Sequence, residues 1–478
     1  MLNKYEVVIG LEVHVELKTK SKIFCGCSTV FGAKPNTQCC PICMGFPGTL
    51  PVLNETVVDY AIKAGLATHC DITRIGKQDR KNYFYPDLPK AYQISQYDLP
   101  LCKEGFVDIS IQGKDKRIGI TRIHIEEDAG KLMHDLNEGT MIDYNRCGVP
   151  LVEIVSEPDM RSADEAIAYL KKLRSILLYT EISDCKLNEG SFRCDVNLSV
   201  RKKGEPEFGT RTEMKNLNSF AFIKNAIEHE TKRQIKAVES GELIVQETRR
   251  WDAIKGESYS MRTKEDAHDY RYFPDPDLAT IVISEDKLNQ IQSELPILPD
   301  ERKKTYIEKY ALAADAAEQL TAQKQLSDYF EMGVAHVKTP SILANLMMTD
   351  IFKSSCGDED EMNFKISPES LAEIVGGIEE GTLNPALAKK AMGYLMEEEG
   401  SVEMILKKYD LEVLKDIERL TKEGEAILEE HPRIVKDFLG GKAKAMGAFM
   451  GQMMKRTQGK ADPEQTEKVF KDIVDKLR

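Results

Sequence analysis

Long apolar segments are missing from this chain. No apolar run reaches the roughly 20 residues that a helix needs to cross a membrane, and the first residues, MLNKYEVVIG, lack the apolar core of a secretory signal. We therefore expect a cytoplasmic protein with no membrane partner. An excess of positive charge is missing too. The net charge is −13, which argues against a surface that coats nucleic acid indiscriminately but still allows a local basic patch.

The common nucleotide-binding motifs are also absent. The sequence has no G-x-x-x-x-G-K-[ST] loop, no G-x-G-x-x-G and no protein-kinase catalytic loop. An ATP site in this chain must therefore be built in another way.

The 478 residues suffice for two or three domains with substantial cores. Strand patterns fill the first part, together with two helices that begin at Ser162 and near Ser219, which predicts an α+β domain. The segment ELPILPDER (294–302) marks a boundary, and the residues after it predict helices. We expect a strand-rich domain (1–294), an all-α domain (295–408) and a small helical tail (409–478).

Residues 5–17, YEVVIGLEVHVEL, predict a half-buried strand because apolar side chains occupy every odd position from Val7. Glu12, His14 and Glu16 then share the opposite face. Neighbours on one strand face are roughly 6.5 to 7 Å apart, so these groups can converge on one ion or one phosphate. The alternative is an ordinary solvated face.

A second strand pattern, EGSFRCDVNLSVR (189–201), has the same character. Cys194 and the alternate apolar residues after it face one way, while Asp195, Asn197, Ser199 and Arg201 face the other. This face is either a set of oxygen donors for a site or a solvated surface.

Acidic residues end a third strand pattern, GITRIHIEEDAGK (119–131). Paired carboxylates suit Mg²⁺, which prefers oxygen ligands and keeps waters and substrate phosphates. Strict alternation places Glu126 beside His124 and Glu127 on the other face, provided that the strand continues past Ile125. The alternative is an acidic turn.

Eleven cysteines, an odd number without a signal peptide, argue against a disulfide framework. Five of them lie between residues 25 and 43. The pairs Cys25/Cys27 and Cys40/Cys43 predict two knuckles around one tetrahedral, structural Zn²⁺. Cys39 is the ambiguous fifth member, since C-x-x-C spacing favours Cys40; unligated thiols are the alternative.

Two segments mix basic residues with other types. In residues 80–101, Arg80, Lys81 and Lys90 alternate with aromatic residues, a pattern typical of nucleotide or nucleic-acid contact, or of a bent loop with a packed aromatic core. In residues 441–463, apolar residues at helical spacing predict a core stripe. The basic residues beside the stripe suit RNA phosphates, or are simply solvated. They are Lys442, Lys444, Lys455, Arg456 and Lys460.

Together these strings resemble the B-subunit family of the bacterial glutamyl-tRNA(Gln)/aspartyl-tRNA(Asn) amidotransferases, over nearly the whole chain. The other segments that carry the resemblance are DYNRCGVPLVEIVSEPDMRS (143–162), GTRTEMKNLNSF (209–220), RRWD (249–252) and DYRYFPDPDL (269–278). The resemblance implies a catalytic cradle with a zinc knuckle, a helical domain and a tRNA-binding tail.

It also implies an activity. The cradle would use ATP to phosphorylate the side chain of glutamate or aspartate carried on tRNA(Gln) or tRNA(Asn), and ammonia would displace the phosphate. A partner amidase (glutaminase) subunit would supply the ammonia through a channel, and a small third subunit would complete the heterotrimer. No glutaminase nucleophile motif is recognised here, in keeping with that division of labour.

Carried over by position, the resemblance implies an Mg²⁺ site and catalytic group of Glu12, His14, Glu127 and Glu153, with Lys81 near the phosphates. It selects Glu127 where alternation favours Glu126. ATP and phosphate binding is expected at Lys81, Lys90, Asp195, Asn197, Glu213 and Lys215. The structural Zn²⁺ at Cys25, Cys27, Cys40 and Cys43 resembles a feature of only part of the family. Alternatives are a non-catalytic subunit that presents tRNA, and a ligase of the synthetase type.

Overall fold

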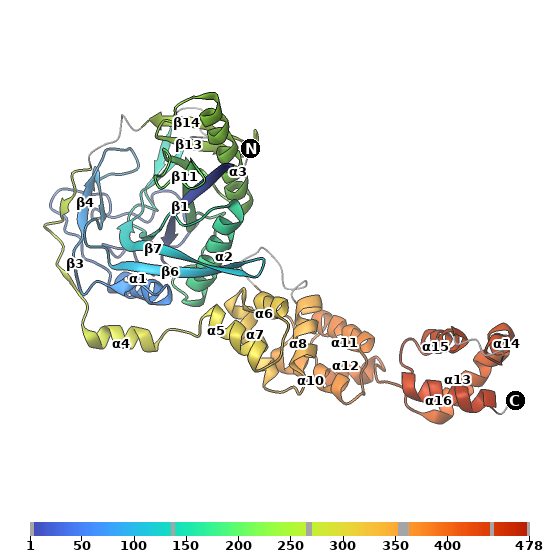
Figure 1. Ribbon diagram of the computed structural model, residues 1–478. Helices are drawn as coiled ribbons and strands as arrows, with labels where there is room; N and C mark the ends of the chain where they lie inside the picture. The colour runs from blue at the N-terminus through green and yellow to red at the C-terminus, as the bar shows by residue number, and fades with distance from the viewer. Residues whose placement is uncertain are drawn as a thin grey trace. The chain divides into compact units, whose positions relative to one another are not determined.

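The computed structural model describes residues 4–134, 139–263, 270–351, 362, 364–439 and 444–475. The chain divides into two compact units, Met1–Pro299 and Asp300–Arg478 (Figure 1). Strands lie in the first unit and the second is helical, which confirms the predicted α+β class. The boundary expected at residue 408 stays a prediction; buried residues of the second unit form two hydrophobic clusters, Tyr306 to Leu411 and Leu420 to Val474.

A nine-stranded sheet frames the first unit, in the order β14-β13-β12-β11-β1-β10-β7-β6-β2. Adjacent strands are antiparallel except β12 and β13, which are parallel. Its strands are β1 (Tyr5–Glu16), β2 (Asp71–Ile72), β6 (Cys102–Ile111), β7 (Lys114–Glu127), β10 (Pro150–Ser156), β11 (Phe192–Lys202), β12 (Thr212–Lys215), β13 (Glu247–Asp252) and β14 (Glu257–Thr263).

Smaller sheets border it, in the orders β15-β4-β5, β16-β3 and β8-β9. Their strands are β3 (Ile75–Gly76), β4 (Asp79–Asn82), β5 (Tyr92–Ser95), β8 (Lys131–Met133), β9 (Met141–Asp143), β15 (Phe273–Pro274) and β16 (Ile281–Val282).

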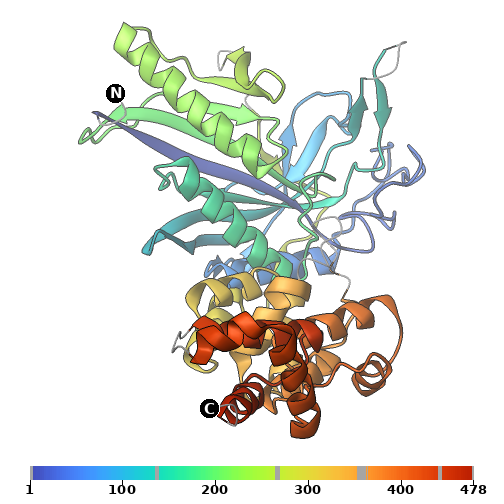
Figure 2. The ribbon, with the colours of Figure 1, turned by 90° about the vertical axis from the view of Figure 1, so that its right-hand side faces the viewer.

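The large sheet has one apolar face, which the helices cover. α2 (Ala163–Tyr179) packs on β6, and α3 (Phe220–Ser240) packs on β11; both lie on the same side of the strands in Figure 2. Each helix begins as predicted, since Ser162 and Ser219 accept hydrogen bonds of 3.1 Å from backbone N–H groups three residues later. Polar residues of the central strands are thereby left on the other face.

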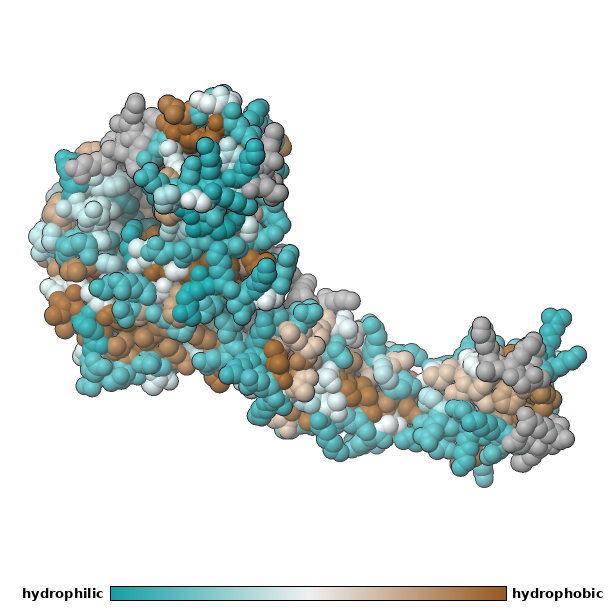
Figure 3. All heavy atoms as spheres, in the orientation of Figure 1, coloured by the Kyte–Doolittle hydropathy of each residue, from teal (hydrophilic) through white to brown (hydrophobic). Residues whose placement is uncertain are grey.

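Next to this core, α1 (Glu55–Ala67) and α4 (Glu285–Ser293) border an apolar groove of about 460 Å³. Leu53, Val58 and Ile62 line one side of it and Ile281 to Ile283 the other. Figure 3 shows hydrophobic side chains gathered at the surface between these two helices. The unit therefore leaves an apolar hollow beside a mostly hydrophilic surface.

The second unit consists of short helices. They are α5 (Pro299–Glu308), α6 (Ala314–Thr321), α7 (Lys324–Val334), α8 (Pro340–Leu346), the π-helix η3 (Met347–Ile351), α10 (Pro368–Glu379), α11 (Pro385–Glu397), α12 (Val402–Lys408), α13 (Ile417–Glu430), α14 (Pro432–Leu439), α15 (Lys444–Arg456) and α16 (Pro463–Asp475). Among the described residues, no helix has the length and apolar character needed to span a membrane.

Candidate active site and metal centre

The polar face of the large sheet gathers side chains from strands that are far apart in sequence. On β1, Val13 and Val15 are buried in the core, and His14 therefore points to the opposite face. The ladder sets His14 beside Glu153 of β10, and Glu153 beside His124 of β7. Directly paired residues point to the same face, so the three side chains meet.

These strands form a histidine–glutamate group made of His14, His124, Glu126 and Glu153. The Nε2 atom of His14 is 3.5 Å from Glu153 Oε2 and 3.8 Å from Glu126 Oε1. The Nε2 atom of His124 is 3.3 Å and 3.7 Å from the same two carboxylates. Ligand atoms of His14, Glu126 and Glu153 lie within 4.8 Å of one another, so one metal ion fits among them.

The close packing of the histidine–glutamate group shifts the pKa values of its members in opposite directions. Burial raises the pKa of Glu153, but His124 and His14 outweigh that effect and hold this pKa well below its usual value. The pKa of His124 is raised to about 9, because the charge of Glu153 and hydrogen bonds to both carboxylates outweigh burial. Two anions packed this closely repel each other, so the group needs positive partners: imidazolium ions or a metal.

Lys81 of β4 supplies a further cation. Its burial disfavours charge, yet the carboxylates of Glu126 and Glu153 raise its pKa. Its Nζ atom lies 5.0 Å from the ring centre of Tyr270 and 5.9 Å from that of Tyr83. Aromatic faces attract a cation without neutralising it, so Lys81 keeps its charge available for a phosphate.

A second acidic group shares β1 with the first and extends over β11 and β12. It consists of Glu12, Asp195 and Glu213, whose oxygen atoms are within 4.8 Å of one another. Asn197 donates a 2.8 Å hydrogen bond to Glu12. Lys215 forms ion pairs with Asp195 and, at 2.8 Å, with Glu213. Burial and then the charge of Glu153 raise the pKa of Glu12, which shows that the two groups interact electrically.

Glu127 does not join either group. Its side chain is buried, forms an ion pair with Lys90 and accepts a 2.9 Å hydrogen bond from the backbone of Ile94. Because β7 continues to Glu127, the alternation that favoured Glu126 holds to the strand's end. The assignment of Glu127 as a metal ligand stays a prediction, and the geometry favours Glu126.

Some residues of this face were not singled out from the sequence. Asp128 accepts a 2.6 Å hydrogen bond from Arg193, and Arg146 lies 3.5 Å from it. Burial and the charge of Asp128 raise the pKa of neighbouring Glu16 to about 8. His124 could have been found, since alternation sets it beside Glu126; Arg146 and Arg193 gave no signal because their partners come from distant strands.

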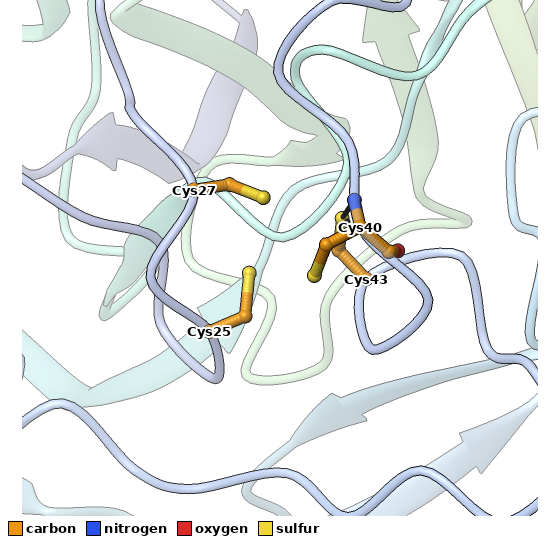
Figure 4. A group of neighbouring side chains, drawn as sticks. All are labelled: Cys25, Cys27, Cys40 and Cys43. Atoms are coloured by element: carbon orange, nitrogen blue, oxygen red, sulfur yellow. Dashed lines mark hydrogen bonds between the residues drawn. The ribbon is translucent and has the colours of Figure 1, made fainter.

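The cysteines form a separate group. The sulfur atoms of Cys25, Cys27, Cys40 and Cys43 lie within 4.8 Å of one another, and Figure 4 shows the four side chains facing a common centre. Zinc–sulfur bonds of about 2.3 Å in a tetrahedron separate sulfurs by roughly 3.8 Å, so four sulfurs this close to one another suit a zinc ion. Cys39 is outside the group, with its sulfur 3.8 Å from Asn145 Oδ1.

The thiols of this group differ in acidity, and the pKa of Cys43 is lowered well below those of Cys25 and Cys27. A hydrogen bond from Cys25 lowers the pKa of Cys43 to about 4, with further help from the Cys40 backbone N–H and the charge of Lys22. Thiolate is the form that binds metal.

In the aromatic segment, part of the basic charge is used within the protein. Arg80 pairs with Asp275 at 2.7 Å and Asp277 at 3.0 Å, so it braces β4 against β15. Phe84 and Tyr85 are exposed, so the interpretation as a packed aromatic core is wrong for these two residues. Contact of the segment with a nucleotide or nucleic acid stays a prediction.

Comparison with known proteins gives the family. Residues 7–289 match the profile of the GatB/GatE catalytic domain, and residues 328–474 match that of the GatB domain. The chain belongs to the GatB/GatE family. Relatives named as the B subunit of aspartyl/glutamyl-tRNA(Asn/Gln) amidotransferase come from Caldicellulosiruptor bescii (53% identical, covering 99% of this chain and 100% of the relative) and Caldanaerobacter subterraneus subsp. tengcongensis (50%, 99% and 100%). A third, from Carboxydothermus hydrogenoformans, is 48% identical over 100% of both chains. The resemblance inferred from the motifs is thus confirmed.

The GatB domain match includes the tail, whose basic residues are partly paired. Arg456 bonds Glu423 at 2.5 Å and Glu430 at 2.8 Å, and Lys460 bonds Asp410 at 2.6 Å. Lys442 and the side chain of Lys444 lie outside the described residues. The predicted contact of this edge with RNA stays a prediction, and the two paired residues weaken the case for it.

Proposed function

We propose that this chain is the subunit of an aspartyl/glutamyl-tRNA(Asn/Gln) amidotransferase that activates, with ATP, the side-chain carboxylate of glutamate or aspartate carried on tRNA. Membership of the GatB/GatE family supports the reaction class. The observation that carries the proposal is the meeting of the histidine–glutamate group and the second acidic group on one face of the large sheet, with Lys81 of β4 close enough for Glu126 and Glu153 to raise its pKa. Such a face can receive a triphosphate and a carboxylate together.

The chemistry explains why such a face is needed. Ammonia cannot displace oxide from a carboxylate, so a carboxylate oxygen first attacks the γ-phosphorus of ATP and ADP leaves. Ammonia then attacks the carbonyl carbon of the acyl phosphate and forms the C–N bond. Phosphate leaves, and the attacking nitrogen loses a proton to solvent or a nearby carboxylate. Phosphoryl transfer depends mainly on positioning and on neutralising charge.

The chain's own groups have definable parts in this reaction. Lys81 would stabilise negative charge on the transferring phosphoryl group. Asn197 orients Glu12, and Lys215 holds Asp195 and Glu213 in place. His14, Glu126 and Glu153, with Glu12 of the adjoining acidic group, would hold Mg²⁺, which when bound would supply positive charge to offset that of the phosphates. We assign Glu126 to this site in place of Glu127 because its ligand atoms adjoin those of His14 and Glu153, whereas Glu12 groups with Asp195 and Glu213.

We further infer a structural Zn²⁺ at Cys25, Cys27, Cys40 and Cys43, because four close sulfurs leave no position for a substrate. The partners would be an amidase (glutaminase) subunit that makes ammonia, a small third subunit, and tRNA(Gln) or tRNA(Asn) charged with glutamate or aspartate.

The decisive experiment measures ADP release by the assembled enzyme with ATP, Mg²⁺, charged tRNA and ammonium chloride. ADP release that requires both the aminoacyl ester and this chain supports the proposal. A complex that amidates without making ADP would instead make this chain a tRNA-presenting subunit. If uncharged tRNA and free amino acid suffice, the synthetase interpretation replaces ours.

The role of the tail is tested separately. Removing residues 414–478 within the complex should weaken charged-tRNA affinity while leaving the sheet unit folded, because the tail has its own buried cluster. Tryptophan fluorescence reports the folding, since the single tryptophan, Trp251, is buried in β13. Unchanged tRNA affinity would reject the assignment.

A further inference from the structure

Lys22 is a fully buried lysine beside the four-cysteine group. Its side chain has 0% of its surface exposed. Its Nζ atom lies 3.7 Å from the sulfur of Cys43 and 3.4 Å from the backbone oxygen of Tyr144. Within the described residues no carboxylate pairs with it. A buried ammonium without an anionic partner is costly.

A second buried lysine shows the usual solution. Lys90 lines the same small cavity of about 70 Å³, together with Lys22, Cys25 and Cys43. Lys90, however, pairs with the carboxylate of Glu127. By contrast with Lys90, Lys22 needs a group other than a carboxylate to balance its positive charge. The ionisable group in hydrogen-bond contact with it is the Cys43 thiol.

In the metal-free chain the lowered pKa of Cys43 supplies one thiolate, whereas four thiolates around one Zn²⁺ carry a formal charge of minus two. The packing keeps Lys22 next to that charge. A Cβ atom on Gly148 would lie 3.6 Å from both Cys43 Cβ and Lys22 Cδ, and Ile23 donates a 3.0 Å backbone hydrogen bond to Gly148. Lys22 is therefore held between this turn and the sulfurs.

We propose that Lys22 is a positioning residue of the zinc site: its buried ammonium donates a hydrogen bond to the Cys43 sulfur and offsets the negative charge of the metal–thiolate group. The proposal rests on zinc binding by the four cysteines and is independent of the ATP-dependent reaction. Its consequence differs in size between the two metal states. Lys22 stabilises the zinc-loaded chain, in which it faces the whole metal–thiolate group, more than the metal-free chain, in which the Cys43 thiolate is its anionic partner.

The first test measures zinc affinity of the full-length chain by competition with a chromophoric chelator. Lys22→Met, which keeps length and removes charge, should weaken zinc binding by about 10- to 100-fold, as is usual when a group that supports a metal ligand is lost. The matched control is Lys20→Met, an exposed lysine in the same segment, which should change affinity by less than about twofold. Unchanged affinity in Lys22→Met overturns the proposal.

The second test separates this role from simple packing. Thermal unfolding followed by Trp251 fluorescence is compared for metal-free and zinc-loaded chains. Lys22→Met should lower the zinc-loaded midpoint by more than it lowers the metal-free midpoint. Equal destabilisation of both states makes Lys22 a packing residue and overturns the proposal. A wild-type chain that binds no zinc overturns it too, while ADP release by the complex still decides the proposed function.

Discussion

Two of the candidate metal groups among the described residues, the histidine–glutamate group and the four cysteines, stand on different kinds of backbone. The histidine–glutamate group projects from β1, β7 and β10, three adjacent strands joined by continuous ladders. The four cysteines come from turns, which are held by local bonds such as Met44 N–H to Cys40 O at 3.0 Å and by single bonds to distant residues such as Gln38 N–H to Asn145 Oδ1 at 2.8 Å. A ladder fixes side-chain positions without a ligand, whereas turns of this kind need the metal to hold them.

The comparison predicts that the sheet group can lose function without losing structure. Its carboxylates repel one another in the absence of metal, yet the strands hold them together. The cysteine group is not held by a strand ladder. Loss of a cysteine ligand should therefore loosen the turns as well as weaken metal binding.

Glu153→Gln should have the largest effect. It removes one charge from the predicted metal site, and we expect ATP-dependent amidation by the complex to fall by about a thousandfold, while charged-tRNA affinity and Trp251 fluorescence stay as in the wild type. Glu157→Gln is the control, because Glu157 is exposed and lies just beyond the same strand. Amidation at the normal rate in Glu153→Gln would remove this group from the mechanism.

Cys40→Ser tests the other side of the comparison. Loss of one of four thiolates should weaken zinc binding by about a hundredfold and speed hydrogen exchange across residues 20–50, because the turns lose their bridge. Cys39→Ser, at the adjacent position but outside the group, should keep zinc content and exchange rates. Equal effects of the two substitutions would mean that the sulfur set is wrong.

How far the sequence predicts this site depends on the range of the contacts. Alternation along residues 5–17 is local, and it placed Glu12 and His14 on one face. The pairing of His14 with Glu153 links strands more than a hundred residues apart, which only the family resemblance could supply. The choice between Glu126 and Glu127 as the metal ligand depended on where β7 ends. Strand ends are poorly marked in sequence.

In the tail, the local structure was predicted correctly but the pairing of Arg456 with acidic residues was not. Local spacing correctly indicated a helix with a buried stripe, since Phe449 and Met453 are fully buried. The basic residues beside it looked available for RNA, but the acids that pair with Arg456 lie on α13, outside the segment that suggested the contact. Charge patterns within one segment do not reveal partners from another.

The pH dependence of the metal-free chain sharpens the comparison further. His124 has a folded pKa of about 9, above the unfolded value of about 6.5. Its stabilisation is therefore complete below pH 6.5 and is lost as pH rises toward 9. The free energy of unfolding of wild type minus that of His124→Gln should fall across this window, by about 3 kcal/mol at most. Urea titrations with chelator present measure it, and a constant or rising difference would contradict the assigned charge of His124.

The smallest expected effect lies at Gly45, between the cysteine turn and the ion pair of Lys90 with Glu127. This residue follows the cysteine turn with φ +69°, and a Cβ atom there would lie 2.5 Å from Cγ of Lys90, the partner of Glu127. Gly45→Ala should displace Lys90 and lower amidation by about three- to tenfold, a barrier change of about 1 kcal/mol. Gly48→Ala carries similar backbone strain at φ +84° but meets nothing within 4 Å, so it isolates the clash. If both variants lose the same activity, backbone strain alone is responsible, and the cysteine turn does not position Lys90.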